Sequence, residues 1–176
     1  MPYPPELEEE VDIGGRHIRI RPIRPEDETR LHAFSARLTP EDVRMRFLQP
    51  LKRLPQPLAQ RLSRIDYQRE MALIACEGEE ILGVVRLSAE AAASAAEFAL
   101  IVRSDRQRLG LGRMLMTRLL AYAWSRGLDE VYGDVLVENT RMLDLCRSLG
   151  CEIRQHPEDS MLLRAVFRRP VHRSGA

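Results

Sequence analysis

Two glycines one residue apart, Gly110 and Gly112, stand in an arginine-rich stretch between Arg103 and Arg113. An apolar, strand-like run precedes them, and an apolar run with helical spacing follows at once. The start of a helix has backbone N–H groups without partners and a partial positive charge, and both stabilise a bound anion. Glycine lets the anion approach closely. The pattern indicates either a phosphate-binding turn or a strand-to-helix turn that needs two glycines only for its geometry.

Two other phosphate-binding motifs do not fit this loop. A nucleoside triphosphate loop would require G-K-[ST], which is missing here. A dinucleotide fingerprint G-x-G-x-x-G that begins at Gly110 would need its third glycine where Leu115 stands. The loop also lies late in the chain for a dinucleotide-binding fold.

The elements around the loop alternate between strands and helices. The expected strands cover residues 17–23, 71–78, 81–88, 97–102, 131–137, 151–155 and 161–167, and the expected helices cover 26–38, 39–47, 55–65, 111–126 and 139–149. This order predicts an α/β (α+β) fold with a single mixed central sheet flanked by helices. We expect a domain over residues 16–169, a disordered N-terminal tail over 1–15 and a C-terminal tail over 170–176.

Bulk composition narrows the functional classes. The 176 residues fit one domain, and the net charge of +1 gives no reason to expect nucleic acid or a membrane as partner. An odd number of cysteines and the lack of a secretory signal predict a reducing, cytoplasmic location. The four histidines are scattered without metal-ligand spacing, so no metal is expected.

The loop and a second motif carry a resemblance to a known family. The pattern Q-x-x-G-x-G at Gln107–Gly112, placed between a strand and an amphipathic helix, resembles the acetyl-CoA pyrophosphate loop of the GNAT N-acetyltransferases. The stretch VLVENTRMLDLCRSLGC, Val135–Cys151, resembles the second signature of that family. The segments IRPIRPEDE, RLTPEDVRMRF, IDYQREMALIA and EFALIVRSD are similar to the acetyltransferase domain of the Pat-type bacterial protein lysine acetyltransferases.

This resemblance implies a GNAT fold, acetyl-CoA as co-substrate and a set of cofactor-binding residues. The strand backbone would bind the pantetheine arm, the loop amides would bind the diphosphate, and Asn139 would face the arm, which leaves open its use as a helix cap. The arginines among these residues could also form a solvated basic face. The expected cofactor-binding residues are Ile101, Val102, Arg103, Gln107, Arg108, Leu109, Gly110, Leu111, Gly112, Arg113 and Asn139.

Glu97 is the expected general base. A lysine side chain with a pKa of about 10.4 is almost entirely protonated at pH 7, so a carboxylate that removes the proton would assist transfer. Glu97 opens the strand that leads to the loop, and a pantetheine arm that runs back along this strand would bring the thioester toward it. In the Pat-type family a glutamate at this place is the base. The alternative is a solvated charge at a strand end.

Cys146 occupies the position where many relatives carry a tyrosine that protonates the departing thiolate. A thiol could donate this proton, or Cys146 could be a small residue of the core.

The prediction for function is a protein Nε-lysine acetyltransferase that acts by direct transfer, with acyl-CoA synthetases as the targets that the resemblance implies. Two alternatives stay open: a small-amine N-acetyltransferase and a non-catalytic acetyl-CoA sensor. In the small-amine alternative, the helical segment 26–65 would supply an acidic wall from Glu41, Asp42, Asp66 and Glu70. The sequence leaves the oligomeric state open.

Overall fold

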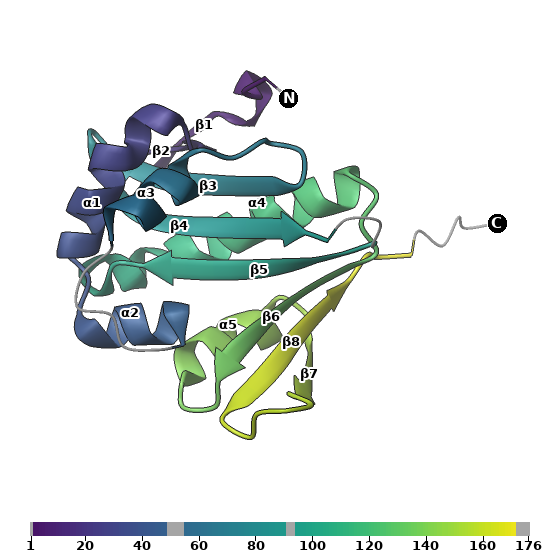
Figure 1. Cartoon of the computed structure of the whole chain (residues 1–176). Helices are drawn as coiled ribbons and strands as arrows, with labels where there is room; N and C mark the ends of the chain where they lie inside the picture. Colours follow the sequence, from purple (N-terminus) through teal and green to yellow (C-terminus); the bar gives the residue numbers. More distant parts are fainter. Residues whose placement is uncertain (1, 49–54, 91–93, 172–176) are drawn as a thin grey trace.

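The computed structural model describes residues 2–48, 55–90 and 94–171, and the side chains of Gln107 and Arg108 lie outside this description. Its described strands form one sheet with the order β1-β2-β3-β4-β5-β6-β8-β7 (Figure 1). The strands are β1 Glu9–Ile13, β2 Arg16–Pro22, β3 Glu70–Glu77, β4 Glu80–Ala89, β5 Ala95–Val102, β6 Glu130–Leu136, β7 Glu152–Gln155 and β8 Leu162–Arg168. The α-helices are α1 Glu28–Ala36, α2 Pro40–Phe47, α3 Gln56–Ser63, α4 Leu111–Ser125 and α5 Thr140–Ser148. This architecture confirms the predicted mixed sheet flanked by helices.

Strands β5 and β6 are the parallel pair of the sheet, and they separate after a short ladder. Their register joins Ala95 to Glu130 and ends where Glu97 meets Tyr132. Strand β5 continues to Val102 and β6 continues to Leu136. The two strands therefore diverge beyond Glu97, as the ribbon shows (Figure 1). This divergence opens the sheet at the end toward which both strands run.

Each face of the sheet has its own apolar core. Helices α4 and α5 cover one face, with Leu115 and Cys146 among the residues buried there. Helices α1 and α3 cover the other face, with Phe34 and Ala59 among the buried residues. Strand β5 alternates between the two environments, since Phe98 and its even-numbered neighbours belong to the core below α4. Glu97 and the other odd-numbered residues of β5 therefore lie on the opposite face.

Gly133 of β6 makes room for Phe98 near the point of divergence. A Cβ atom at position 133 would lie 2.6 Å from the Phe98 ring, closer than any real contact. The ring also packs edge-on against Phe167, with centroids 5.8 Å apart. An aromatic side chain thus packs between the two separating strands, and glycine at position 133 permits it.

The N-terminal segment is ordered, in contrast to the predicted disordered tail over residues 1–15. Strand β1 pairs with β2 in a register that runs from Glu9–Ile20 to Ile13–Arg16. Val11 and Ile13 pack against the core, and Arg118 of α4 binds the carboxylate of Glu9 at 2.6 and 2.7 Å. Two apolar residues that alternate along the strand and one ion pair are enough to form this edge strand. The prediction of a disordered tail overlooked this short pattern. Of the predicted C-terminal tail, residues 172–176 lie outside the described part.

Candidate active site

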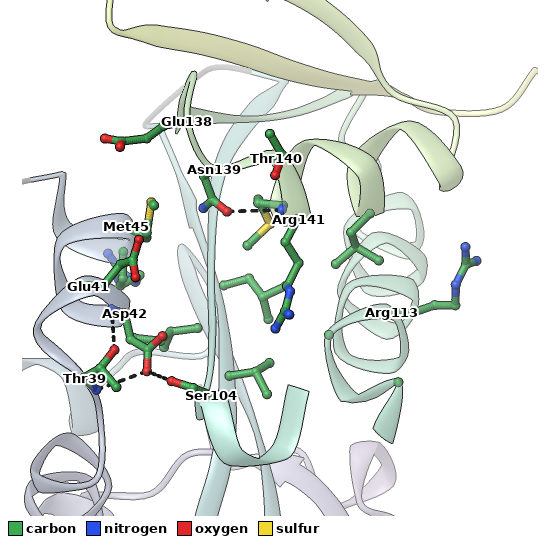
Figure 2. Close-up of a pocket in the computed structure, with 18 residues that line it drawn as sticks. Thr39, Glu41, Asp42, Met45, Ser104, Arg113, Glu138, Asn139, Thr140 and Arg141 are labelled. Carbon is green, nitrogen blue, oxygen red and sulfur yellow. Dashed lines mark hydrogen bonds between the residues drawn. The ribbon is translucent and has the colours of Figure 1, made fainter. Parts of the chain in front are cut away.

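A cleft of about 580 Å³ lies where β5 and β6 diverge, and its size is in the range of small-molecule sites. Helix α2 forms one wall, and the first turns of α4 and α5 form the other (Figure 2). The end of β5 provides Leu100, Ile101 and Val102. The remaining lining residues are Thr39, Glu41, Asp42, Met45, Arg46, Ser104, Gly110, Gly112, Arg113, Glu138, Asn139, Thr140, Arg141, Met142 and Leu145.

The start of α4 opens into this cleft without a side-chain cap. Gly110 precedes the helix with φ at +77°, a left-handed conformation that favours glycine. Among the described side chains, none accepts a hydrogen bond from the first N–H groups of α4. A Cβ atom at Gly112 would lie 3.3 Å from the Leu145 side chain, so close packing also favours glycine there. Both glycines have a structural reason, and the uncapped amides beside them leave a place for an anion.

Asn139 both caps a helix and borders the cleft. Its side-chain oxygen accepts a hydrogen bond from the backbone N–H of Met142 at 3.2 Å, at the start of α5. The same residue lines the cleft, so the two roles left open by the sequence are compatible in one place.

Two arginines on the wall formed by α4 and α5 point in different directions. Arg141, the second residue of α5, extends into the cleft, whereas Arg113 points away from it (Figure 2). Arg113 donates a hydrogen bond to the Ser148 hydroxyl at 2.6 Å and so links α4 to α5. Among the described residues, Arg141 forms no ion pair with a carboxylate. Sequence analysis missed Arg141, although it stands two residues after Asn139 in the second signature.

The side chain of Arg103, one of the expected cofactor-binding residues, is engaged within the protein and is neither solvated nor available to a phosphate. Its side chain is only 1% exposed and binds the Asp105 carboxylate at 3.0 and 2.8 Å, with Glu80 at 3.4 Å. Its backbone N–H donates to the carbonyl of Leu82 at 2.9 Å. Arg103 therefore fixes the turn between β5 and the short 3-10 helix Ser104–Leu109.

The expected loop residues contribute backbone rather than side chains. Leu111 is fully buried and Leu109 packs against the core below α4. Gln107 and Arg108 lie within the 3-10 helix, but their side chains lie outside the described residues. Ile101 and Val102 line the cleft as expected. The loop thus offers amide groups at the mouth of α4, while its apolar side chains hold it in place.

Helix α2, a wall that sequence analysis did not assign to the cofactor cleft, is positioned by polar contacts. Thr39 and Asp42 exchange side-chain and backbone hydrogen bonds at 3.1 Å in a capping box. The hydroxyl of Ser104 also donates to Asp42, which ties α2 to the end of β5. Arg44 pairs with Glu138 across the cleft at 2.6 Å. These contacts place α2 over the gap between the diverging strands.

The four acids expected in a small-amine pocket have separate places. Glu41 and Asp42 line the cleft, but Asp42 is engaged in the cap of α2. Asp66 accepts three backbone N–H groups at 2.8 to 3.1 Å in a turn, and Glu70 pairs with Arg61. The structure therefore does not assemble a closed acidic pocket from these four residues.

Glu97 lies at the last paired position of β5, beside the cleft rather than in its lining. It is exposed, yet the surrounding protein excludes enough water to raise the pKa of its carboxyl group. The negative charge of Asp134 raises this pKa further, and the Arg46 guanidinium opposes the shift. A carboxylate with a raised pKa is a stronger base than a free one, so this environment suits proton abstraction.

Cys146 does not reach the cleft. It is fully buried in the core below α4, and burial raises the pKa of its thiol to about 12. A proton donor has to reach the reacting atoms, and this thiol is absent from the residues that line the cleft. The structure therefore favours the core role over the role of general acid.

Comparisons with known proteins agree with this geometry. The model of the acetyltransferase (GNAT) family matches residues 40–151. The acetyltransferase PA5475 of Pseudomonas aeruginosa is 36% identical over 150 residues, which are 83% of this chain and 81% of that protein. The crystal structure of the GNAT domain of S. lividans PAT superposes with a TM-score of 0.89 at 27% identity, over 96% of this chain and 100% of that chain.

A more distant structure shares the fold alone. Spermidine N-acetyltransferase from Vibrio cholerae, solved with CoA and spermine, has a TM-score of 0.70 at 20% identity, over 86% of this chain and 95% of that chain. The fold, the family match and the curated relative define an acetyltransferase. The chain belongs to the GNAT acetyltransferase family and is an acetyl-CoA-dependent acyltransferase.

Two further findings describe the rest of the molecule. No group of three or more His, Cys, Asp or Glu side chains that could hold a metal ion occurs among the described residues. Within residues 2–48, 55–90 and 94–171, no helix combines the length and apolar content that crossing a bilayer requires.

Proposed function

We propose that the protein is an Nε-lysine acetyltransferase that transfers the acetyl group directly from acetyl-CoA, with Glu97 as general base. The observation that carries the proposal is the position of Glu97, a carboxylate of raised pKa at the point where β5 and β6 diverge. Protein lysines and acyl-CoA synthetases as targets, and a cytoplasmic location, belong to the same proposal.

The cleft has the groups that acetyl-CoA requires. The uncapped amides at Gly110–Gly112 would hold the diphosphate, and Arg141 would add a positive charge close by. Beyond Glu97 the ladder between β5 and β6 stops, so the edge of β5 at Leu100 and Ile101 faces the cleft instead of β6. This edge is suited to the amide groups of a pantetheine arm.

The chemical step uses few side chains. Glu97 accepts a proton from the acceptor ammonium group, and the free amine nitrogen attacks the thioester carbonyl carbon. A C–N bond forms, the C–S bond breaks, the nitrogen releases its second proton to water, and coenzyme A leaves as a thiolate. Because Cys146 is buried away from the cleft, water supplies the proton that the thiolate takes up.

A protein acceptor is supported by two observations. The GNAT domain of S. lividans PAT matches 96% of this chain at 27% identity. Glu97 is exposed, so a side chain on the surface of another protein could reach it without entering a closed pocket. The spermidine acetyltransferase shares only the fold at 20% identity, which gives little support to a polyamine acceptor.

The test is an assay of thiol release with two acceptor classes. The purified protein is incubated with acetyl-CoA and either acyl-CoA synthetases or a panel of polyamines, amino acids and aminoglycosides. The proposal predicts transfer to synthetase lysines, located by mass spectrometry, and its loss in Glu97→Gln. Transfer only to small amines, or binding of acetyl-CoA without transfer to any amine, would contradict it.

A further inference from the structure

Two arginines beside Glu97, the buried Arg86 and the partly exposed Arg46, form no ion pair with a carboxylate of the described chain. Arg86 of β4 is 7% exposed, and its Nη1 atom is buried without a hydrogen-bond partner, while Nη2 donates to the carbonyl of Leu62 at 2.7 Å. Arg46 of α2 lies with its guanidinium 4.6 Å from the Phe47 ring centroid and also lines the cleft. A buried cation without a counter-charge is costly, so an arrangement of this kind calls for an anion.

The described chain does not supply this anion. Among the described residues, no carboxylate forms an ion pair with Arg46 or Arg86. The acid whose charge Arg86 senses, Glu70, is held by both Nη atoms of Arg61 at 2.9 and 2.6 Å. The segments 49–54 and 91–93 contain no Asp or Glu at all. Within the described chain, both guanidinium groups therefore lack a directly bound carboxylate and can receive one from another molecule.

The electrostatics of the two guanidinium groups agree with this need. Desolvation, together with the positive charge of Arg46, lowers the pKa of Arg86 to about 10. Desolvation also lowers the pKa of Arg46, and Glu97 opposes this shift. The two arginines are thus close enough to repel each other, and Arg46 is close enough to Glu97 to attract it. An anion between the two guanidinium groups would relieve the repulsion.

The sheet register places this pair next to the proposed base. Arg86 is paired across the ladder with Ala99, and Ser88 is paired with Glu97. Cross-strand partners share a face, so Arg86 and Glu97 are diagonal neighbours about 7–8 Å apart on the face below α2. Arg46 reaches the same place from α2. If the amine of an acceptor lies at Glu97, the groups a few bonds away from that amine would lie next to the two arginines.

We propose that Arg46 and Arg86 form an acceptor subsite for a carboxylate, so that the favoured acceptor is an amine with a carboxylate a few bonds away. This inference rests on the proposed acetyl transfer at Glu97. The carboxylate has two chemical sources, the main-chain carboxylate of a free amino acid or an acidic residue next to a target lysine in a peptide. Both sources present the same planar group to the guanidinium forks.

The test compares acceptors that differ only in this charge. One pair is Nα-acetyl-lysine and its amide, and the second pair is two short peptides with Glu or Gln beside the same lysine. We expect kcat/KM to be about 10- to 100-fold higher for the carboxylate member of at least one pair. A preference in the first pair identifies the free amino acid as the source, and a preference in the second pair identifies the peptide.

Variants assign the preference to these arginines. Arg46→Gln should bring the ratio within a pair close to one, and Arg86→Lys, which keeps the charge but loses the fork, should reduce it in part. Arg37→Gln is the matched control, because Arg37 pairs with Glu80 on the surface, and it should keep the ratio. Both members of a pair meet the same Glu97, so the ratio does not depend on a change in its basicity.

Three results would overturn the subsite. The first is an equal kcat/KM within both pairs, and the second is an equal loss of kcat/KM for both acceptors of a pair in Arg46→Gln. The third is no turnover of any of the four acceptors while protein lysines are still acetylated. The last result would leave the proposed function intact. Failure to acetylate any amine, small or protein, would contradict the proposed function and the subsite together.

Discussion

Helix α4 and helix α2 border the same cleft, but different forces attach them to the protein. Six of the 15 residues of α4 are buried against the sheet, and its first turn has no side-chain cap. None of the eight residues of α2 is buried, and its first turn is closed by a capping box. Apolar burial therefore holds α4, whereas hydrogen bonds and the Arg44–Glu138 ion pair hold α2.

This difference suits the two tasks that we propose for the cleft. The cofactor is the same in every reaction cycle, so the helix start that receives it can be fixed in place by a core and left uncapped for the diphosphate. The acceptor side has to admit a separate molecule, and polar contacts at the surface can rearrange at small cost. The comparison predicts that substitutions on α4 cost stability and substitutions on α2 change acceptor use.

The largest difference should come from removing apolar contacts. Leu115 of α4 is fully buried, so Leu115→Ala should lower the free energy of unfolding by about 2–5 kcal/mol. Met45→Ala on α2 should cost less than half of that loss, because Met45 is only partly buried at the cleft. Urea denaturation of both variants measures the two losses. Equal losses would contradict the claim that apolar burial holds α4 more strongly than α2.

The packing between the diverging strands should give the next largest effect. Gly133→Ala places a methyl group against the Phe98 ring, and we expect a loss of about 1–3 kcal/mol in the free energy of unfolding. Phe98→Leu combined with Gly133→Ala should recover part of this loss, because the smaller side chain leaves room. A Gly133→Ala variant as stable as the wild type would show that the ring does not constrain the two strands.

The pH dependence of transfer should move in opposite directions for two charge changes. Glu97 acts as a base only when ionised, so activity falls as the pH drops through its raised pKa. Asp134→Asn removes a negative charge that raises this pKa, so the acid limb of kcat/KM should shift to lower pH. Arg46→Gln removes a charge that lowers it, so the limb should shift to higher pH. Shifts in the same direction would exclude Glu97 as the titrating base.

The smallest effect should belong to the ion pair across the cleft. Arg44 and Glu138 are both partly exposed, so Arg44→Gln should leave the free energy of unfolding nearly unchanged. The KM for the acceptor should change more than the dissociation constant of acetyl-CoA, since the pair holds α2 and not α4. A double-mutant cycle with Glu138→Gln measures the coupling between the two residues, and a large coupling would place α2 among the rigid elements.

The parts of the fold with strong local signals could be predicted from sequence. The loop glycines, the apolar stripe of α4 and the acidic start at Thr39–Asp42 each act within a few residues, and the mixed sheet agrees with them. Strand β1 was missed because its alternating pattern has only two apolar residues and its ion-pair partner, Arg118, lies far along the chain. An edge strand of this kind depends on a distant contact that no local pattern records.

The candidate site was predictable in its backbone and less so in its side chains. The position of Glu97 relative to the loop followed from strand spacing, but Arg103 looks the same in sequence whether it binds phosphate or Asp105. Arg46 is remote in sequence from Glu97, and Arg86 lies on the preceding strand, so the placement of α2 and the sheet register decide that both come close to it. Burial and pairing of charges depend on tertiary structure, so sequence reasoning could not assign them.

A structure of the protein with coenzyme A tests the account most directly. We predict the diphosphate at the amides of Gly110–Gly112, the pantetheine arm along β5 from Ile101 toward Phe98, and the sulfur atom next to the Glu97 carboxylate. A diphosphate bound away from the start of α4, or a sulfur atom outside the gap between β5 and β6, would contradict the account.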